Sequence, residues 1–482
     1  MLFNSISFLI FFSIVFILYW LIFNKSHRSQ NILILCSSYF FYAWWDWRFL
    51  SLIFLSTIVD FFIGHQIFRV KGQDKRCFYL CCSIFFNVSL LGFFKYFNFF
   101  IDSWINLLDL FGFTIQNFWF INIILPVGIS FYTFQTMSYS IDIYLKKLKP
   151  TKDFIAFATF VSFFPQLIAG PIERASNLLP QILSKRIFYF KNITQGIKII
   201  IWGLFKKVVI ADNCSTVVSN VFNNYNEYSG LICLLSAFLF SIQIYCDFSG
   251  YSDIAIGLSK CLGIKLMTNF KVPYFSQNIT DFWRRWHISL SSWFKDYIFI
   301  PLGGSKKGEI KTIKNIFVVF ILSGLWHGAN WTFIFWGIGN GILYILYKLI
   351  KNLNIFKVNN IKNSFIQIIF SFIKSSSTFF SITLLWVLFR SNTLNDALSY
   401  YSKIWSISIN DQFNFDNSGL LVLIFILFMI ESIFKNRDFI FDTKKMETFQ
   451  SNLFNYFILP FIVWLIIILE PNQNAHFIYF QF

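Results

Sequence analysis

Residues 315 to 347 read NIFVVFILSGLWHGANWTFIFWGIGNGILYILY, a run of 33 residues without Asp, Glu, Lys or Arg. A helix crosses the hydrocarbon core of a bilayer in about 20 residues, so this run is long enough to enter a membrane. Its only side chain that titrates below pH 8 is His327, which Gly324 and Gly328 bracket. The stretch therefore predicts a membrane protein with an ionisable group in an apolar setting.

The rest of the chain agrees with a membrane protein. Of 482 residues, 56% are hydrophobic and 13% are charged, which is far more apolar than soluble globular chains usually are. Further candidate spans lie at Met1–Asn24, Leu110–Ile141, Phe154–Ile172, Tyr228–Cys246 and Ser451–Leu469, and near 31–45, 48–68, 77–94, 196–212, 363–389 and 417–430. We expect an all-α polytopic protein with roughly 10–13 membrane helices.

The first run has no cleavage site of small residues and continues into Lys25, His27 and Arg28. It is therefore interpreted as a retained first helix with a cytoplasmic basic flank, rather than as a removed signal peptide. The formal net charge of +17 gathers in short connections such as Lys146–Lys149. Such clusters are typical of cytoplasmic loops, so no nucleic-acid partner is expected. The eight cysteines show no CxxC pairing, so they predict neither disulfides nor a cysteine-ligated metal.

No polar stretch is long enough for a separate soluble domain, and the sequence shows no internal repeat. We expect one integral membrane domain over 1–482. It would consist of N-terminal helices (1–115), a central catalytic block (about 116–350) and a C-terminal helical block (about 360–482). Glycine-rich and polar segments concentrate between about 126 and 345. Irregular backbone at membrane depth requires a protein or water-filled surrounding, so the central block is predicted to enclose a cavity.

The segment DFWRRWH, residues 281–287, places four ionisable side chains between aromatic rings. Thr280 is a plausible N-cap, and Pro301 follows at the far end, which predicts a helix over about 281–296. On that helix one face would carry Trp283, Trp286, Leu290 and Trp293, and another face would carry Arg284, His287, Ser291 and Lys295.

Arg284, Arg285 and Lys295 would together cost on the order of 8–10 kcal/mol against lipid at mid-bilayer. Two placements of this helix remain open. It either lies at the cytoplasmic interface with snorkelling arginines, or it lines a polar tunnel.

His327 favours the tunnel, because an ionisable side chain within a membrane is by default a functional candidate and imidazole is the usual general base. Ser323 and Asn330 lie within four residues of it. A buried structural histidine is the alternative. A metal site formed by His287, His327 and Asp247 is disfavoured because no HxxxH or HExxH spacing occurs. A serine nucleophile is disfavoured because no GxSxG occurs.

Several segments together resemble one family. They are PVGISFYTFQ (126–135), FFPQLIAGPIER (163–174), GLFKKVVIADN (203–213), QIYCDFSGYSDIAIG (243–257), DFWRRWHISLSSWFKDYIFIPLGG (281–304), SGLWHGANWTFIFWG (323–337) and WVLFRSNTLNDALSYY (386–401). The chain resembles the membrane-bound O-acyltransferase family, in its bacterial branch of alginate and peptidoglycan O-acetyltransferases. Asp281 departs from that pattern, which more often has Asn.

The resemblance implies helices and re-entrant segments around a central tunnel, with His327 at the catalytic histidine position and His287 at the second histidine position. It implies an acetyl group moved from a cytoplasmic thioester donor, acetyl-CoA or another acyl thioester, to an extracytoplasmic polysaccharide. It also implies a periplasmic or membrane-anchored acetyltransferase partner, no bound cofactor, and the bacterial inner membrane as location. Residues expected to line the tunnel or bind substrate are Asn330, Trp283, Arg284, Arg285, Trp286, Asp247, Tyr251, Ser323 and Trp326.

In this hypothesis His327 removes the proton from an acceptor hydroxyl, and Asn330 or a protonated His287 stabilises the oxyanion. Arg284, Arg285, Lys206 and Lys207 are candidates for holding the CoA phosphates. A transporter or flippase of a lipid-linked glycan or acyl carrier is the alternative function, although the chain lacks the paired halves common in such folds. A structural scaffold with inert histidines is a third alternative.

Overall fold

The computed structural model describes residues 1–113, 123–168, 170–352, 364–407, 417–434 and 454–469. These residues form helices and connecting segments, with no strand among them, which confirms the all-α prediction. The chain divides into two compact units. Unit 1 comprises Met1–Ile197 and Ala255–Met267, and unit 2 comprises Lys198–Ile254 and Thr268–Phe482. Helices α10 (Phe190–Leu204) and α12 (Gly230–Cys261) each contribute residues to both units.

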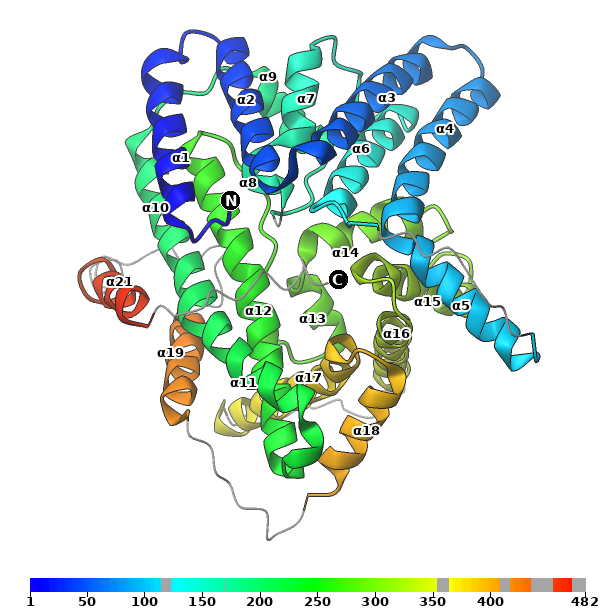
Figure 1. The fold of residues 1–482 in the computed structure, drawn as a ribbon, viewed down its shortest axis with the longest axis vertical. Helices are drawn as coiled ribbons and strands as arrows, with labels where there is room; N and C mark the ends of the chain where they lie inside the picture. The colour runs from blue at the N-terminus through cyan, green and yellow to red at the C-terminus, as the bar shows by residue number, and fades with distance from the viewer. Residues whose placement is uncertain (114–122, 169, 353–363, 408–416, 435–453, 470–482) are drawn as a thin grey trace. The chain divides into compact units, whose positions relative to one another are not determined.

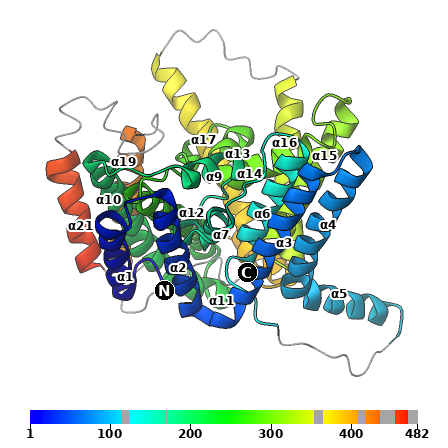
Figure 2. The same cartoon turned by 90° about the horizontal axis from the view of Figure 1, so that it is seen from above.

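Unit 1 consists mainly of the N-terminal helices of the chain, which are drawn in blue to blue-green in Figure 1. Its other elements are α1 (Ile6–Ile17), η1 (Leu18–Ile22), α2 (His27–Asp46), η2 (Trp47–Phe49), α3 (Leu50–Arg69), α4 (Gln73–Leu91), η3 (Gly92–Tyr96), α5 (Phe97–Leu110), α6 (Ile129–Tyr144), α7 (Phe154–Ser162), α8 (Phe164–Leu167) and α9 (Ala175–Leu183). Helices α3, α4 and α6 pack side by side, as the view from above also shows (Figure 2).

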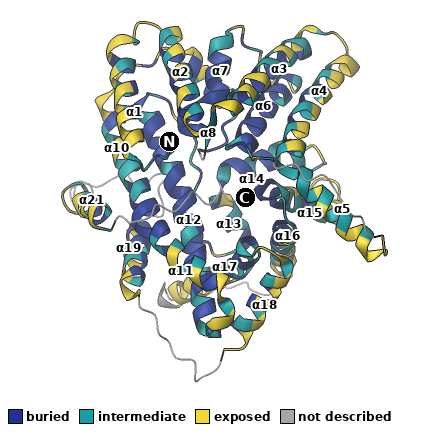
Figure 3. Ribbon diagram, viewed as in Figure 1, coloured by how far each residue is buried: buried dark blue, intermediate teal, exposed yellow. Residues whose placement is uncertain are grey.

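The centre of unit 1 is α6, almost all of whose residues are buried, whereas α5 has no buried residue (Figure 3). A polar cluster joins three helices there. Asp60 on α3 accepts hydrogen bonds from Ser83 Oγ (2.5 Å) and Asn87 Nδ2 (2.8 Å) on α4 and from Ser140 Oγ (3.1 Å) on α6. A buried carboxyl group is tolerated only when such donors surround it, so this cluster fixes how the three helices pack.

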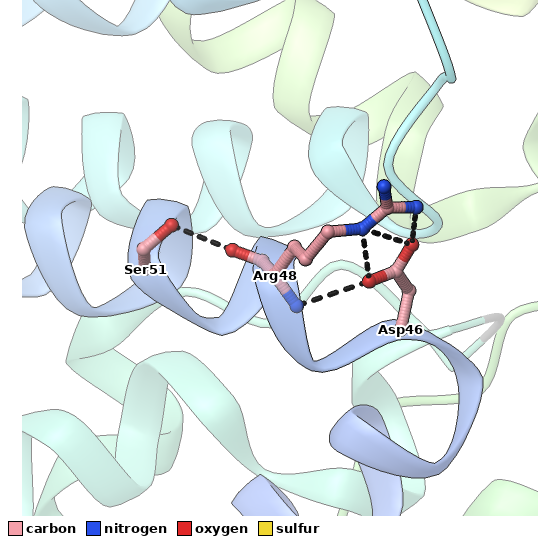
Figure 4. Close-up of polar contacts among 3 residues, drawn as sticks. All are labelled: Asp46, Arg48 and Ser51. Atoms are coloured by element: carbon pink, nitrogen blue, oxygen red, sulfur yellow. Dashed lines mark hydrogen bonds and ion pairs between the residues drawn. The ribbon is translucent and has the colours of Figure 1, made fainter.

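The bend between α2 and α3 has a local cause. Asp46 accepts a hydrogen bond from the Arg48 backbone N–H (3.0 Å) and pairs with the Arg48 guanidinium, at 2.6 Å from Nη2 to Oδ2 (Figure 4). Ser51 Oγ donates to the Arg48 carbonyl at 2.7 Å. These short-range bonds cap the 3₁₀ turn η2 and start α3.

The predicted span Phe154–Ile172 is wrong as a single helix. Helix α7 ends at Ser162, Phe163 has an extended backbone (φ −54°, ψ 103°), and α8 begins at Phe164. Pro165 has no N–H and lies in the first turn of α8, where a helix needs no N–H donor. The Phe164 N–H, which the break frees, donates to Ser38 Oγ at 3.1 Å.

Unit 2 holds the two histidine segments. Its other elements are η4 (Phe205–Ala211), α11 (Asp212–Asn223), η5 (Tyr225–Glu227), η6 (Pro273–Phe275), α13 (Ile279–Arg285), α14 (Ile288–Phe294), η7 (Lys295–Phe299), α15 (Glu309–His327), α16 (Trp331–Asn352), α17 (Ser364–Arg390), α18 (Leu394–Trp405), α19 (Ser418–Phe434), η9 (Phe454–Ile458) and α21 (Leu459–Ile468). Helices α15 and α16 form a hairpin, and α17 packs on α16 (Figures 1 and 2).

Glycine lets the two arms of the α15–α16 hairpin touch. A Cβ at Gly324 would lie 2.3 Å from the Phe333 carbonyl oxygen, and one at Gly337 would lie 2.4 Å from the Phe320 carbonyl oxygen. Real Cβ atoms do not approach backbone so closely, so only glycine permits this packing. The hairpin turns at Gly328–Asn330, directly after His327.

Six helical stretches in the described part of the chain are long and apolar enough to cross a membrane: His27–Arg69, Gln73–Leu110, Gly230–Cys261, Glu309–His327, Trp331–Lys351 and Ile366–Arg390. Shorter apolar helices lie at Ile6–Ile22, Phe154–Leu167, Ser418–Ile433 and Asn455–Ile468. The protein is thus a multi-pass membrane protein. The number of helices that span the bilayer, and the division into three blocks of one domain, stay predictions.

Candidate active site

The helix predicted over 281–296 is interrupted at His287. Helix α13 ends at Arg285, His287 adopts the left-handed conformation (φ 42°, ψ 55°), and α14 starts at Ile288. The N-cap is Asn278 rather than Thr280, because the Asn278 side chain accepts the Asp281 N–H at 2.9 Å. A positive φ is rare for a residue with a Cβ and is kept only where neighbours enforce it.

Asn269 is the residue that holds His287 in this conformation. The Ile288 N–H donates to the Asn269 carbonyl (2.9 Å), and the Ser289 N–H and Oγ both donate to Asn269 Oδ1 (3.2 and 2.9 Å). Asn269 Nδ2 donates in turn to Ser252 Oγ at 3.0 Å. The chain on both sides of the histidine is therefore fixed by one buried amide.

The same amide sets the tautomer of His287. His287 Nδ1 lies 3.1 Å from Asn269 Oδ1, which is an acceptor, so Nδ1 carries the proton in the neutral ring. Nε2 is then the unprotonated nitrogen, and it has no hydrogen-bond partner among the described residues. Burial lowers the pKa of His287, which keeps the ring neutral. A neutral Nε2 accepts hydrogen bonds, so the lowered pKa disfavours a protonated His287 as oxyanion donor, and that role stays a prediction.

His327 is the last residue of α15 and is buried among aromatic rings. Its ring centroid lies 5.0 Å from Trp326, 5.1 Å from Trp336 and 5.3 Å from Phe389. The rings of His327 and His287 lie 6.4 Å apart. Two segments that are 40 positions apart in the sequence therefore bring their imidazoles to one place.

Both histidines line a cavity of about 530 Å³, here called the histidine cavity. Its volume falls within the range of about 300–1,000 Å³ that small-molecule sites occupy. The lining consists of Thr280, Trp283, Arg284, His287, Ile288, Leu290, Ser291, Ser292, Phe294, Lys295, Phe299, Ser305, Thr312, Ile316, Val319, Phe320, Ser323, His327, Tyr344 and Lys348.

The histidine cavity has a charged, exposed end and a buried end. Arg284, Lys295 and Ser305 are exposed, whereas Ser323, His287 and His327 are buried. The lining holds three cationic side chains, including Lys348, and no Asp or Glu. Such a cavity suits a ligand with a negatively charged end and a neutral reactive end.

The predicted residues Trp283, Arg284 and Ser323 lie in the lining of the histidine cavity. Ser323 is one helical turn before His327 on α15, so its hydroxyl and the imidazole share a face. Trp326 packs 5.6 Å from the His287 ring without lining the cavity. Trp286 is fully buried 5.1 Å from Trp386, also outside the lining.

Four other predicted residues are engaged elsewhere. Arg285 pairs with Asp281 (3.0 Å) and does not line the histidine cavity. Asn330 donates from Nδ2 to the Asn392 carbonyl (2.8 Å) and accepts the Thr332 N–H (3.1 Å), so its amide ties the hairpin turn to the end of α17. Asp247 and Tyr251 are buried on α12 outside the cavity lining. These four side chains do not line the histidine cavity, and their predicted roles in the tunnel or at the oxyanion stay predictions.

Lys206 and Lys207 do not face a charged mouth, contrary to their predicted role with CoA phosphates. Both side chains are buried. Lys207 Nζ lies 2.7 Å from Asp212 and 2.8 Å from Asp247, and Lys206 Nζ lies 2.6 Å from Asp253. A buried ion pair with matched partners holds its helices together rather than binding a diffusing anion.

The sequence did not predict several residues of the site, among them Lys348, Asn269, Trp336 and Phe389. Lys348 follows the uncharged run directly, at helical spacing (i, i+4) from Tyr344, and that spacing was the available signal. Asn269, Trp336 and Phe389 had no readable signal, because their contacts with the histidines are made by folding.

The fold and the site thus define a multi-pass membrane protein with a histidine pair at the buried end of a cationic cavity. Residues 88–389 match the model of MBOAT, the membrane-bound O-acyltransferase family. The chain is 36% identical to a probable alginate O-acetylase AlgI of Pseudomonas putida, over 100% of both chains. It is also 36% identical to a peptidoglycan O-acetyltransferase of Helicobacter pylori, over 78% of this chain and 73% of the relative.

A teichoic acid D-alanyltransferase of Bacillus subtilis is 33% identical over 48% of this chain and 61% of the relative. The chain belongs to the membrane-bound O-acyltransferase family. It is an O-acyltransferase of the membrane, and the predicted family resemblance is confirmed.

Proposed function

We propose that this protein takes an acetyl group from acetyl-CoA on the cytoplasmic side and delivers it for O-acetylation of an extracytoplasmic polysaccharide. One observation carries the proposal: a single cavity joins Arg284, Lys295 and Lys348 to the two histidines. CoA has a polyanionic nucleotide end and a neutral thioester end. The lining of the histidine cavity offers complementary groups, namely the exposed cations Arg284 and Lys295, the half-buried Lys348 and the two buried imidazoles.

The charges around α15 and α16 support a cytoplasmic position for the cationic end. Lys306, Lys307, Lys311 and Lys314 surround the start of α15, and Lys348, Lys351, Lys357 and Lys362 follow one another at and after the end of α16. The hairpin turn Gly328–Asn330 carries no charge. By the positive-inside bias, the lysine-rich ends face the cytoplasm and the turn faces the other way.

The chemistry requires a general base, and hydrogen-bond donors stabilise the oxyanion that forms at the thioester carbonyl. In the proposed step His327 takes the proton of the attacking hydroxyl while its oxygen bonds to the thioester carbon. The C–S bond then breaks, and the proton passes to the departing thiolate. Such general-base catalysis is typically worth about 10²–10⁴ in rate. His287 Nε2 would accept an N–H or O–H of a substrate, and Ser323 offers a hydroxyl donor beside His327.

The proposal also covers the acyl acceptor and the membrane in which the protein lies. Relatives are named as alginate and peptidoglycan O-acetyltransferases, which favours a cell-envelope polysaccharide and the bacterial cytoplasmic membrane. A periplasmic or membrane-anchored acetyltransferase would complete the transfer where this chain does not reach the glycan itself. The proposal requires no bound cofactor, because the acyl donor is a substrate.

Membrane vesicles of known sidedness test donor and direction together. Acetyl-labelled CoA, which does not cross membranes, is added outside inverted or right-side-out vesicles that contain the protein and envelope glycan. We expect ester-linked label only from inverted vesicles, whose cytoplasmic face is outside, and none from inverted vesicles with His327→Ala. Equal labelling from both orientations would overturn the proposed direction.

A further inference from the structure

A second, smaller pocket lies at the end of α17, here called the Arg390 pocket. It has a volume of about 140 Å³ and is lined by Phe222, Asn223, Tyr225, Arg390, Ser391, Asn392, Asp396 and Tyr400. All of these residues belong to unit 2. The volume is below the range of about 300–1,000 Å³ for drug-sized ligands, so the pocket accommodates one sugar ring or one charged group.

Arg390 is the cationic side chain in the lining of this pocket. Its guanidinium lies over the Phe222 ring, 5.6 Å from the centroid, and it forms no hydrogen bond or ion pair with the described residues. Asp396, the acidic residue of the lining, accepts hydrogen bonds from the Thr393 N–H (3.1 Å) and Thr393 Oγ1 (2.8 Å) in the N-terminal cap of α18. A half-buried guanidinium that stacks on a ring and is not bonded to the carboxylate in its pocket can receive an anion.

The Arg390 pocket is connected to His327 through two contacts. Phe389, the residue before Arg390, packs 5.3 Å from the His327 ring. Asn392, in the pocket lining, accepts a hydrogen bond from Asn330 at 2.8 Å, and Asn330 follows His327 by three residues. The pocket therefore lies at the hairpin-turn end of α15 and α16, whereas Lys348 and Thr312 of the histidine cavity lie toward their other ends.

We propose that the Arg390 pocket binds a carboxylate-bearing sugar of the acceptor, on the side of His327 opposite the donor. This inference rests on the proposed function, since it assigns the acceptor side of the same reaction. The guanidinium fork would pair with the sugar carboxylate in a bidentate manner, and the amides of Asn223 and Asn392 would hydrogen-bond its hydroxyls.

The lining favours a carboxylate over a phosphate and a sugar over a peptide. Asp396 lines the same pocket, and its repulsion is weaker for a carboxylate with one negative charge than for a dianionic phosphate. The wall consists mainly of amide, hydroxyl and phenol groups, which match sugar hydroxyls and ring faces. Peptide-binding grooves instead provide apolar pockets for side-chain anchors or an exposed strand edge.

Direct binding to the detergent-solubilised full-length protein tests the assignment. The probes are a hexuronate tetrasaccharide and the same tetrasaccharide with its carboxyl groups reduced to alcohols, together with an acidic peptide. We expect the hexuronate to bind about 10- to 100-fold more tightly than its reduced form. One charge-assisted bidentate pair between the Arg390 guanidinium and a carboxylate contributes a gain of this size.

Arg390→Lys is the decisive variant, because lysine keeps the positive charge at the C-terminal end of α17 but lacks the fork. It should lose the preference for hexuronate while its KM for acetyl-CoA stays that of the wild type. Lys403→Ala is the control, since Lys403 is a half-buried cation of α18 that donates to the Asn226 carbonyl outside the pocket (3.2 Å). It should keep the preference.

Three results would overturn the inference: equal binding of both tetrasaccharides to the wild type, an unchanged preference in Arg390→Lys, or Arg390-dependent binding of the peptide alone. Failure of the proposed function looks different. In that case no acetyl label reaches any glycan, although the hexuronate still binds through Arg390.

Discussion

The imidazole rings of His287 and His327 lie 6.4 Å apart at the buried end of one cavity, yet their surroundings differ. His287 is held by the Asn269 amide with Nε2 unprotonated, whereas His327 is enclosed by Trp326, Trp336 and Phe389. His287 is therefore a fixed hydrogen-bond acceptor, whereas His327 is the proposed general base. This division of roles makes each ring separately testable.

Asn269→Ala should lower acetyl transfer by about 10- to 100-fold, the size of effect seen when a partner that orients a histidine is removed. The loss should appear in kcat, because His287 would no longer be fixed in its left-handed conformation and tautomer. Ser252→Ala is the matched control, since it removes only the contact on the far side of the amide. Equal losses in both variants would show that Asn269 acts through folding alone.

Lys348→Ala should raise the KM for acetyl-CoA about 10-fold with a smaller change in kcat, because a charged contact to a donor phosphate is lost. Lys351→Ala removes a cation one turn further along α16, outside the cavity lining, and should leave the KM unchanged. Initial rates over a range of acetyl-CoA concentrations give both constants. Identical KM values for the two variants would speak against a donor-binding role for Lys348.

Gly324→Ala should destabilise the protein by about 1–3 kcal/mol, because its Cβ would collide with the Phe333 carbonyl oxygen in the α15–α16 hairpin. Gly419→Ala on α19, which would meet no atom within 4 Å, serves as the comparison and should unfold like the wild type. Thermal unfolding in detergent measures both. A wild-type midpoint for Gly324→Ala would refute the close packing of the hairpin.

Glu173 predicts a pH dependence of stability. Burial raises the pKa of Glu173 to about 7, although Asn177 Nδ2 (2.5 Å) and the Met267 N–H both donate to it. The unfolded chain has a pKa near 4.3, so the folded state holds a proton that the unfolded state releases. The stabilising contribution is complete below about pH 4 and is lost as the pH rises through about 7.

Glu173→Gln should therefore flatten the fall in the thermal midpoint between pH 5 and pH 8. Glu227→Gln, at an exposed position in η5, should keep the slope of the wild type. Parallel slopes for the wild type and Glu173→Gln would show that the carboxyl group is ionised throughout.

Composition and run length were enough to predict helices and a membrane, because hydrophobicity and helix length set these directly. The turn between α15 and α16 after His327 was not predicted. Regular spacing also placed Arg284, His287, Ser291 and Lys295 together, and all four line the histidine cavity. The helix break at His287 was not predictable from spacing. It depends on Asn269, whose amide is brought to His287 only by the fold.

Positive charge in the sequence was not enough to identify side chains that are available to bind phosphate. Lys206 and Lys207 looked available in the sequence. Asp212 lies only five positions from Lys207, but the other two carboxylate partners, Asp247 and Asp253, lie some 40 positions or more away along the chain. Asn330 looked suited to an oxyanion because it is close to His327 in sequence, yet its amide bonds to Asn392 on another helix end. Such partners follow from tertiary contacts, which local sequence does not encode.

The central claim is that His327 transfers an acyl group destined for the cell envelope. Its most direct test is mass analysis of ester-linked acetate on envelope glycans from cells that lack this protein, supplied with either the wild type or His327→Ala at equal membrane abundance. The account predicts restored O-acetylation with the wild type and none with His327→Ala. Equal O-acetylation with both, or no difference between cells with and without the wild type, would contradict it.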